Sequence, residues 1–186
     1  MIAEIPVPAF EDVLNFWFHE TKPEQRFAHS DDFDRTIRTR FGSTLEAAAR
    51  GELHSWRETL RGRLAEIIVL DQFSRNLYRG TTRAFAQDGM AMVLAQEAMR
   101  DAAHQGLGAE ERQFLYLPFM HSESLVIHEL AMKLFRDLGL ESAYRYEILH
   151  HDIIKRFGRY PHRNEILGRV STPEEIEFLK EPGSSF

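Results

Sequence analysis

The chain has 186 residues, of which 43% are hydrophobic and 28% are charged, and this length suits one folded core. Its 23 Lys and Arg stand against 29 Asp and Glu, and the resulting net charge of −6 argues against nucleic-acid binding. The absence of cysteine excludes disulfides, thiolate metal sites and a cysteine nucleophile, and it fits a reducing cytoplasm. No apolar stretch approaches the ~20 residues of a membrane-spanning helix, so we expect a cytoplasmic protein with no membrane partner.

Apolar residues recur at helical spacing through the first half of the chain. Side chains at i, i+3, i+4 and i+7 share one helix face, and this spacing predicts helices over Phe10–Phe18 and Asp31–Arg50. Lys22-Pro23 breaks the first helix, and Gly51 is well placed to end the second. A third stretch, Arg63–Phe73, is apolar nearly all round. Its periodicity alone would also suit a buried strand, but its length and context favour a central helix.

Capping and stop signals predict further helices in the second half. After a turn at Arg79-Gly80, we expect helices from Thr81 or Thr82 to about Gln105, from Glu110 to Phe119 with a stop around Pro118, from Ser122 to Leu138 before Gly139, and from Ser142, as the cap, to Phe157 before Gly158. A last short helix follows Thr172-Pro173-Glu174-Glu175, which forms a capping box. We expect Ile176 and Leu179 to dock this last helix.

The fold class follows from these patterns. No run alternates polar and apolar residues over the length of a strand, and no Asn-Gly or Asp-Gly hairpin turn occurs. We therefore predict an all-α protein, a single domain over residues 1–186 that forms a compact bundle of stacked antiparallel helix pairs.

Polar residues interrupt the apolar pattern first at the end of the central helix. On a helix Asp71 lies four residues from Arg75, and Gln72 lies four residues from Asn76, so we expect two polar pairs on adjoining faces. The pairs either form an internal salt bridge with amide caps or belong to a ligand site, because a buried polar network must be satisfied internally or by a ligand.

A second polar segment places His121 and Glu123 at the expected start of a helix, with His128 seven residues after His121 and nearly on the same face. Histidine can bind metals or transfer protons near neutral pH. Alternatively, Ser122 caps the helix, Glu123 favours its N-terminal dipole and His121 bonds the backbone.

A third segment concentrates positive charge after a helix, with Gly158 and Pro161 shaping the loop. Its candidate ligand-binding residues are Arg159, Arg163 and Asn164, and His162 is an acid–base candidate. Arginine forks recognise carboxylate and phosphate oxygens at two points. We expect Asn164 to cap the following turn. The alternative is a structural loop whose arginines neutralise nearby carboxylates.

These segments resemble a known family, the bacterial "domain of unknown function" family numbered 924, over about Val13 to Phe186. The resemblance rests on motifs spread along the chain: Phe16-Trp17-Phe18, Phe33-Asp34, Arg40-Phe41-Gly42, Ala49-Arg50-Gly51-Glu52-Leu53, Leu70-Asp71-Gln72-Phe73, Arg75-Asn76, Arg79-Gly80-Thr81, Ala84-Phe85, Tyr116-Leu117-Pro118-Phe119, His121-Ser122-Glu123, Phe157-Gly158-Arg159, Pro161-His162-Arg163-Asn164 and Leu167-Gly168-Arg169. The sequence departs from the family pattern at Ser74, where proline is usual, and at Tyr160, where phenylalanine is usual. Ser74 would let the central helix run further. The resemblance implies an all-α, tetratricopeptide-like fold and no known activity or catalytic residues.

Two function hypotheses follow. In the first, the three segments converge into a pocket for a small anionic ligand, in a binding domain or a hydrolase-like enzyme. Its acid–base candidates are His121, Glu123, Asp71 and His162, and its ligand-binding candidates are Gln72, Arg75, Asn76, Arg159, Arg163 and Asn164. In the second, the domain presents a groove to a protein or peptide partner.

No motif identifies a cofactor. The sequence contains no Gly-x-Ser-x-Gly elbow, P-loop or dinucleotide fingerprint. A metal site would use His121, Glu123 and His151 or His162, but no His-Glu-x-x-His spacing occurs, so we expect neither metal nor cofactor. The oligomeric state is left open.

Overall fold

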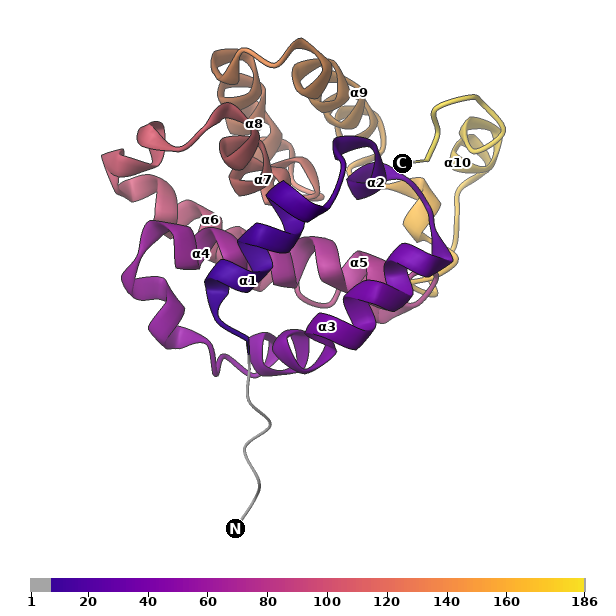
Figure 1. Ribbon diagram of the computed structural model, residues 1–186. Helices are drawn as coiled ribbons and strands as arrows, with labels where there is room; N and C mark the ends of the chain where they lie inside the picture. Colours follow the sequence, from indigo (N-terminus) through magenta and orange to yellow (C-terminus); the bar gives the residue numbers. More distant parts are fainter. Residues whose placement is uncertain (1–7, 186) are drawn as a thin grey trace. The chain divides into compact units, whose positions relative to one another are not determined.

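Helices make up the regular structure of the protein, as the computed structural model in Figure 1 shows for residues 8–185. Between these residues there is no strand, which confirms the all-α prediction. The chain divides into two compact units: unit 1 comprises the chain up to Arg79 together with Arg83–Leu107, and unit 2 comprises Gly80–Thr82 together with the chain from Gly108 onward. We describe each unit by itself. The single domain and the tetratricopeptide-like stacking stay predictions.

Unit 1 contains six α-helices among its described residues and two π-helical turns. The helices are α1 (Phe10–Asn15), α2 (Pro23–Phe27), α3 (Asp31–Ala49), α4 (Leu60–Ile68), α5 (Ser74–Leu77) and α6 (Asp88–Arg100), and the π-helical turns are Phe16–Glu20 and Val69–Phe73. Its core is aromatic: the ring of Phe73 lies 5.2 Å from that of Phe41 and 5.5 Å from that of Trp17. Such clusters bury large apolar areas, which helps to hold short helices together.

Helix α3 agrees closely with the sequence prediction. The Ser30 hydroxyl accepts a hydrogen bond from the Phe33 N–H at 3.3 Å and so caps the N-terminus. Gly51 follows the helix with φ of +73°, a conformation that glycine adopts without the steric cost of a Cβ. The apolar side chains spaced along one face of α3 are buried: Phe33, Ile37, Phe41, Leu45 and Ala48.

The central helix is longer than the predicted Arg63–Phe73. It begins at Leu60, where the Thr59 hydroxyl accepts a hydrogen bond from the Gly62 N–H at 3.0 Å. It passes through the π-helical turn Val69–Phe73 directly into α5, so the run continues to Leu77, as Ser74 in place of proline allows.

The helix predicted from Thr81 or Thr82 to Gln105 is wrong at both ends. The observed α6 covers only Asp88–Arg100, with a 3₁₀ turn at Thr82–Ala84 before it and another at Ala102–Gly106 after it. The Asp101 carboxylate accepts a hydrogen bond from the Ala103 N–H at 2.9 Å and starts the second turn, which ends the α-helix.

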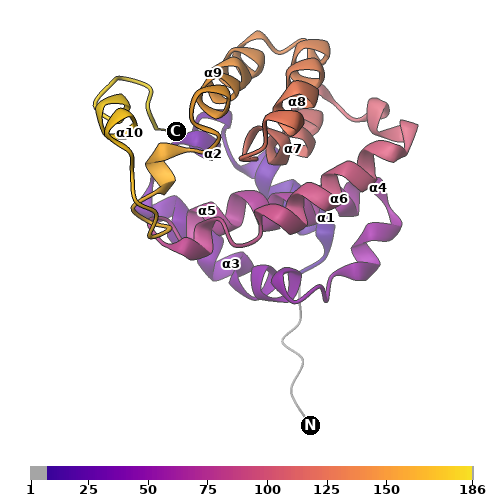
Figure 2. The same ribbon diagram turned by 180° about the vertical axis from the view of Figure 1, so that it is seen from behind.

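Unit 2 is built on α7 (Ala109–Met120), α8 (Leu125–Leu138) and α9 (Glu141–Phe157), followed by a 3₁₀ turn at Pro161–Arg163 and by α10 (Pro173–Phe178). Helix α8 lies beside both α7 and α9, as Figures 1 and 2 show. Gly139 and Gly158 end α8 and α9 with φ of +78° and +68°, as predicted. No helix within residues 8–185 has both the length and the apolar character to cross a membrane.

Several predicted helix ends in unit 2 are wrong. Pro118 does not stop α7, which continues to Met120. Helix α8 begins at Leu125, so Ser122 is not its cap, and α9 begins at Glu141, so Ser142 lies in its first turn. Neither serine determines where its helix begins, because a capping residue is only one contribution to the position of a helix end.

The capping box of α10 is confirmed, but the predicted docking residues are not. The Thr172 hydroxyl accepts from the Glu175 N–H at 3.2 Å, and Glu175 Oε2 accepts from the Thr172 N–H at 2.7 Å. Ile176 and Leu179 are 48% and 36% exposed, whereas the Phe178 ring packs 5.0 Å from that of Phe157. Phe178 therefore docks the helix.

Candidate functional site

The first polar segment forms ion pairs within unit 1. Arg75 Nη1 lies 2.9 Å from Asp71 Oδ1, so the predicted pair is present. The guanidinium also donates to both carboxylate oxygens of Asp88, from Nη1 at 2.9 Å and from Nη2 at 3.0 Å. The predicted pair of Gln72 with Asn76 does not form. Gln72 donates to Asp71 Oδ2 at 2.6 Å, and Asn76 donates to Asp34 Oδ1 of α3 at 2.7 Å. Two carboxylates thus compensate the charge of Arg75.

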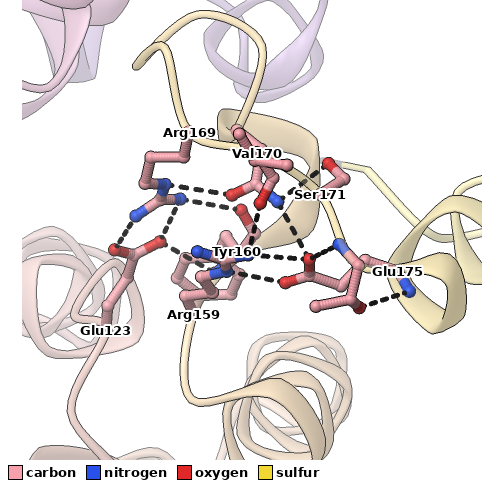
Figure 3. A network of polar contacts seen from close by, with 9 residues as sticks. Glu123, Arg159, Tyr160, Arg169, Val170, Ser171 and Glu175 are labelled. Carbon is pink, nitrogen blue, oxygen red and sulfur yellow. Dashed lines mark hydrogen bonds and ion pairs between the residues drawn. The ribbon is translucent and has the colours of Figure 1, made fainter.

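The second and third segments meet in unit 2, in the network that Figure 3 draws. Glu123 accepts hydrogen bonds from Arg169 Nη1 at 2.6 Å and Nη2 at 2.9 Å, and from the Tyr160 N–H at 2.8 Å. Burial alone would raise the pKa of Glu123, but these hydrogen bonds outweigh it and hold the pKa below its ordinary value. Glu123 is therefore held in its ionised form, the form that pairs with Arg169.

A second ion pair lies in the same network. Arg159 contacts both oxygens of Glu175, at 2.6 and 2.8 Å, and this pairing is the main reason that the pKa of Glu175 falls to about 2. Asn164 donates to Glu175 at 3.3 Å and accepts from Arg169 at 2.9 Å. Asn164 therefore bridges the two ion pairs; it ends the 3₁₀ turn and does not cap the next one, contrary to the prediction.

Arg169 and Glu175 are charged members of this network that the sequence prediction did not include among the site residues. Arg169 lies 46 residues from its partner Glu123, and Glu175 lies 16 residues from its partner Arg159, so no local spacing could connect either pair. The segment from Arg159 to Glu175 is thereby clamped to the loop between α7 and α8.

His128 is fully buried in α8 and belongs to a chain of hydrogen bonds. Its Nε2 lies 2.8 Å from the Ser122 carbonyl oxygen and its Nδ1 lies 2.7 Å from Glu147 Oε1. A carbonyl can only accept, so Nε2 carries a proton, and His128 and Glu147 share one further proton between them. Burial raises the pKa of Glu147, which favours the form in which the proton lies on the carboxyl group.

Histidines gather around the buried ring of Tyr160. That ring lies 5.6 Å from His150 and 5.5 Å from His162, and the Arg163 guanidinium carbon lies 4.5 Å from its centroid. Burial is the main cause that lowers the pKa of His150 to about 3, and repulsion from the neighbouring histidines, His121 among them, adds to the effect. His121 ends α7 and His128 lies on α8, so the expectation that they share one helix face is wrong.

The predicted candidates thus fall into two groups. Unit 2 brings together the candidates of the second and third segments: His121, Glu123, Arg159, His162, Arg163 and Asn164. Unit 1 holds Asp71, Gln72, Arg75 and Asn76. Their convergence into one pocket stays a prediction. Across residues 8–185, no three His, Asp or Glu side chains are arranged as a metal site requires.

A small pocket lies elsewhere in unit 1, and the sequence prediction did not include it. This Ser74 pocket has a volume of about 30 Å³, and its polar lining residues are Glu46, Ser74, Tyr78, Arg83 and Gln87. Ser74 is 1% exposed, and its hydroxyl has no hydrogen-bond partner within residues 8–185. A buried hydroxyl without a partner costs on the order of 1–3 kcal/mol, and Ser74 is one of several buried polar atoms in residues 8–185 in this position.

Charged groups stand at the rim of the Ser74 pocket. Arg83 donates to Glu46 Oε1 at 2.7 Å and to the Tyr78 hydroxyl at 2.6 Å, and its guanidinium lies over the Tyr78 ring. Tyr78 in turn donates to Glu46. This last hydrogen bond is the main cause that lowers the pKa of Glu46, so the rim holds one ionised carboxylate and one guanidinium.

The protein is all-α, and most of the charged residues in its three polar segments form ion pairs. The chain belongs to the bacterial family of proteins of unknown function DUF924, whose family model matches residues 13–183.

Among solved structures, a protein of unknown function from Agrobacterium tumefaciens, ATU0120, is similar to this chain. It shares 39% sequence identity and superposes with a TM-score of 0.88, covering 92% of this chain and 96% of its own. No curated protein matches the sequence.

Proposed function

We propose that the protein is a small-ligand-binding domain whose site is the Ser74 pocket. The observation that carries the proposal is the Ser74 hydroxyl, buried beside a pocket and without a partner among residues 8–185. Native proteins leave few buried polar atoms unsatisfied, and each one that remains needs an explanation, such as a bound water or a ligand. A volume near 30 Å³ limits the enclosed part of the ligand to a few non-hydrogen atoms.

The Ser74 pocket is a better candidate than the pocket expected from the three polar segments. Arg75 is paired with two carboxylates, Asp71 and Asp88, through both of its terminal nitrogens, so an anion would have to displace them, whereas Arg83 is paired with one carboxylate through Nη2 alone. Arg159 is likewise engaged with Glu175, and Glu123 with Arg169. These residues support a structural role, because breaking such pairs leaves a partly buried charge without its partner.

Hydrolysis at Ser74 is a weaker proposal than binding. A serine nucleophile needs a base within hydrogen-bond reach of its hydroxyl. Within residues 8–185 the Ser74 hydroxyl bonds no side chain, so nothing there would activate it. Binding requires only that the ligand satisfy the hydroxyl.

The test is a thermal-shift screen with glycine, urea, acetamide, glycerol and acetate as probes. Binding at the Ser74 pocket predicts that at least one probe raises the unfolding midpoint of the parent protein and loses the effect in Ser74→Ala. Ser55→Ala removes an exposed hydroxyl that does not line the pocket, and it should respond like the parent. If every probe shifts Ser74→Ala as much as the parent, the proposal is wrong.

A protein-interaction module is the second candidate. Exposed apolar side chains favour it: Val126 on α8 is 80% exposed and Tyr146 on α9 is 56% exposed. Amphipathic peptides use such surfaces as anchors. Peptides selected from a display library should then lose binding to Val126→Glu and keep binding to Lys133→Glu on the same helix; equal loss in both variants would count against the candidate.

A further inference from the structure

The rim of the Ser74 pocket carries balanced charge. Glu46 is ionised and Arg83 is positive, and their side chains are 47% and 58% exposed, so a ligand can reach both from solvent. A net anion placed here would meet the Glu46 carboxylate, and a net cation would meet the Arg83 guanidinium. Like charges brought together cost affinity, so this rim favours a ligand with no net charge.

Both charged side chains retain unused hydrogen-bonding atoms. Arg83 donates through Nη2 alone, and its Nη1 and Nε bond no group of residues 8–185. Glu46 accepts through Oε1, and its Oε2 receives no hydrogen bond from that part of the chain. The lining of the pocket thus includes a charged donor, a charged acceptor and the buried Ser74 hydroxyl, which can donate or accept.

The geometry points to a small zwitterion as the ligand, a molecule with one ammonium and one carboxylate group such as a small α-amino acid. This inference rests on the proposed function. The carboxylate would bind the free N–H groups of Arg83, and the ammonium would bind Glu46 Oε2. Guanidinium–carboxylate contact is directional and strong, which suits recognition of a small molecule.

The apolar walls restrict the remainder of the ligand. Leu45, Ala49 and Ala86 line the pocket beside the polar groups, so a methyl or hydroxymethyl substituent is the size that the space accepts. A hydroxymethyl group could also bond the Ser74 hydroxyl. We therefore expect glycine, L-alanine and L-serine to bind more tightly than L-phenylalanine, whose ring is larger than the pocket and would stay in solvent.

In a calorimetric titration of the full chain, probes that each lack one charged group test the two charged contacts separately. Glycinamide lacks the carboxylate, N-acetylglycine lacks the ammonium, and acetamide lacks both. The inference predicts that glycine, L-alanine or L-serine binds at least about tenfold more tightly than each charge-blocked probe, as the loss of one charged hydrogen bond implies. Arg83→Gln and Glu46→Gln should each abolish that preference, and both sites are exposed enough for the variants to fold.

The outcomes distinguish this inference from the proposed function. If acetamide binds as tightly as glycine and Ser74→Ala abolishes both, the pocket binds neutral polar ligands and the zwitterion inference is overturned. If none of the probes binds in calorimetry or in the thermal-shift screen, water alone satisfies Ser74 and both proposals fail. A preference for L-alanine that survives Glu46→Gln and Arg83→Gln would also overturn the inference.

Discussion

Replacing His150 with asparagine should make the protein less sensitive to mild acid. His150 lies on the buried face of α9, and its Nδ1 lies 2.7 Å from the Tyr146 carbonyl oxygen. Asparagine can place an amide N–H near the same position, so His150→Asn keeps a donor while removing the titratable group. The variant therefore removes the protonation of residue 150 while it keeps the hydrogen bond.

The magnitude follows from the displaced pKa. In the unfolded chain His150 takes up a proton near its ordinary pKa of 6.5, whereas the folded protein holds that pKa at about 3. The unfolded state thus gains protons as the pH falls, and the stability that neutral His150 contributes above pH 6.5 is lost progressively towards pH 3. Between pH 7 and pH 5 the linkage relation gives a loss of about 2 kcal/mol from this residue.

Urea unfolding followed by circular dichroism at pH 7 and pH 5 measures the effect. The parent should lose about 2 kcal/mol more of its unfolding free energy between these values than His150→Asn does. Packing changes in the variant occur at both pH values and cancel in the difference. His54→Asn, at an exposed histidine, should follow the parent. Equal losses in parent and His150→Asn would refute the reasoning.

Three further local features can be tested by urea unfolding. Gly62→Ala should destabilise the protein by about 3 kcal/mol, because a Cβ there would overlap the Trp56 carbonyl oxygen. Gly89→Ala, where a Cβ meets open space, should stabilise it by about 0.5 kcal/mol. Destabilisation by both variants would contradict this reasoning. Thr172→Ala removes the cap of α10 and should cost about 1 kcal/mol, with Thr172→Ser restoring most of it. Arg169→Met should lower the unfolding free energy by about 2 kcal/mol, because the half-buried Glu123 carboxylate loses its two hydrogen bonds from the guanidinium. An unchanged unfolding midpoint would show that this ion pair does not stabilise the protein.

Helix ends were predicted well where a capping residue or a terminal glycine lies within one turn of the end. Helix α3 and the capping box of α10 agree with the sequence because Ser30, Gly51 and Thr172 act on residues within one turn. The start of α6 was missed because neither Thr81 nor Thr82 caps this helix. Its first residue is Asp88, which is paired with Arg75 of α5.

The candidate site was predictable only in part, for the same reason. The pair of Asp71 with Arg75 follows from helical spacing, but the true partner of Asn76 is Asp34, 42 residues earlier. The Ser74 pocket combines α3 with residues 74–87, so no short motif describes it. Its one available signal was Ser74 itself, a hydroxyl at a position where the family resemblance leads one to expect proline.

The π-helical turn Val69–Phe73 gives the central helix one position at which its length can change. A π turn accommodates one residue more than the same rise of α-helix. Deleting a single residue there would let the backbone close into regular α-helix with nearly the same rise and rotation, so the residues downstream would keep their orientation relative to α4. Ser74 would still line its pocket and Arg75 would still face Asp88, whereas a deletion within Leu60–Ile68 would rotate both by about 100°. A one-residue gap at the π turn of a related chain is therefore compatible with the same pocket, and a gap within α4 would signal a different one.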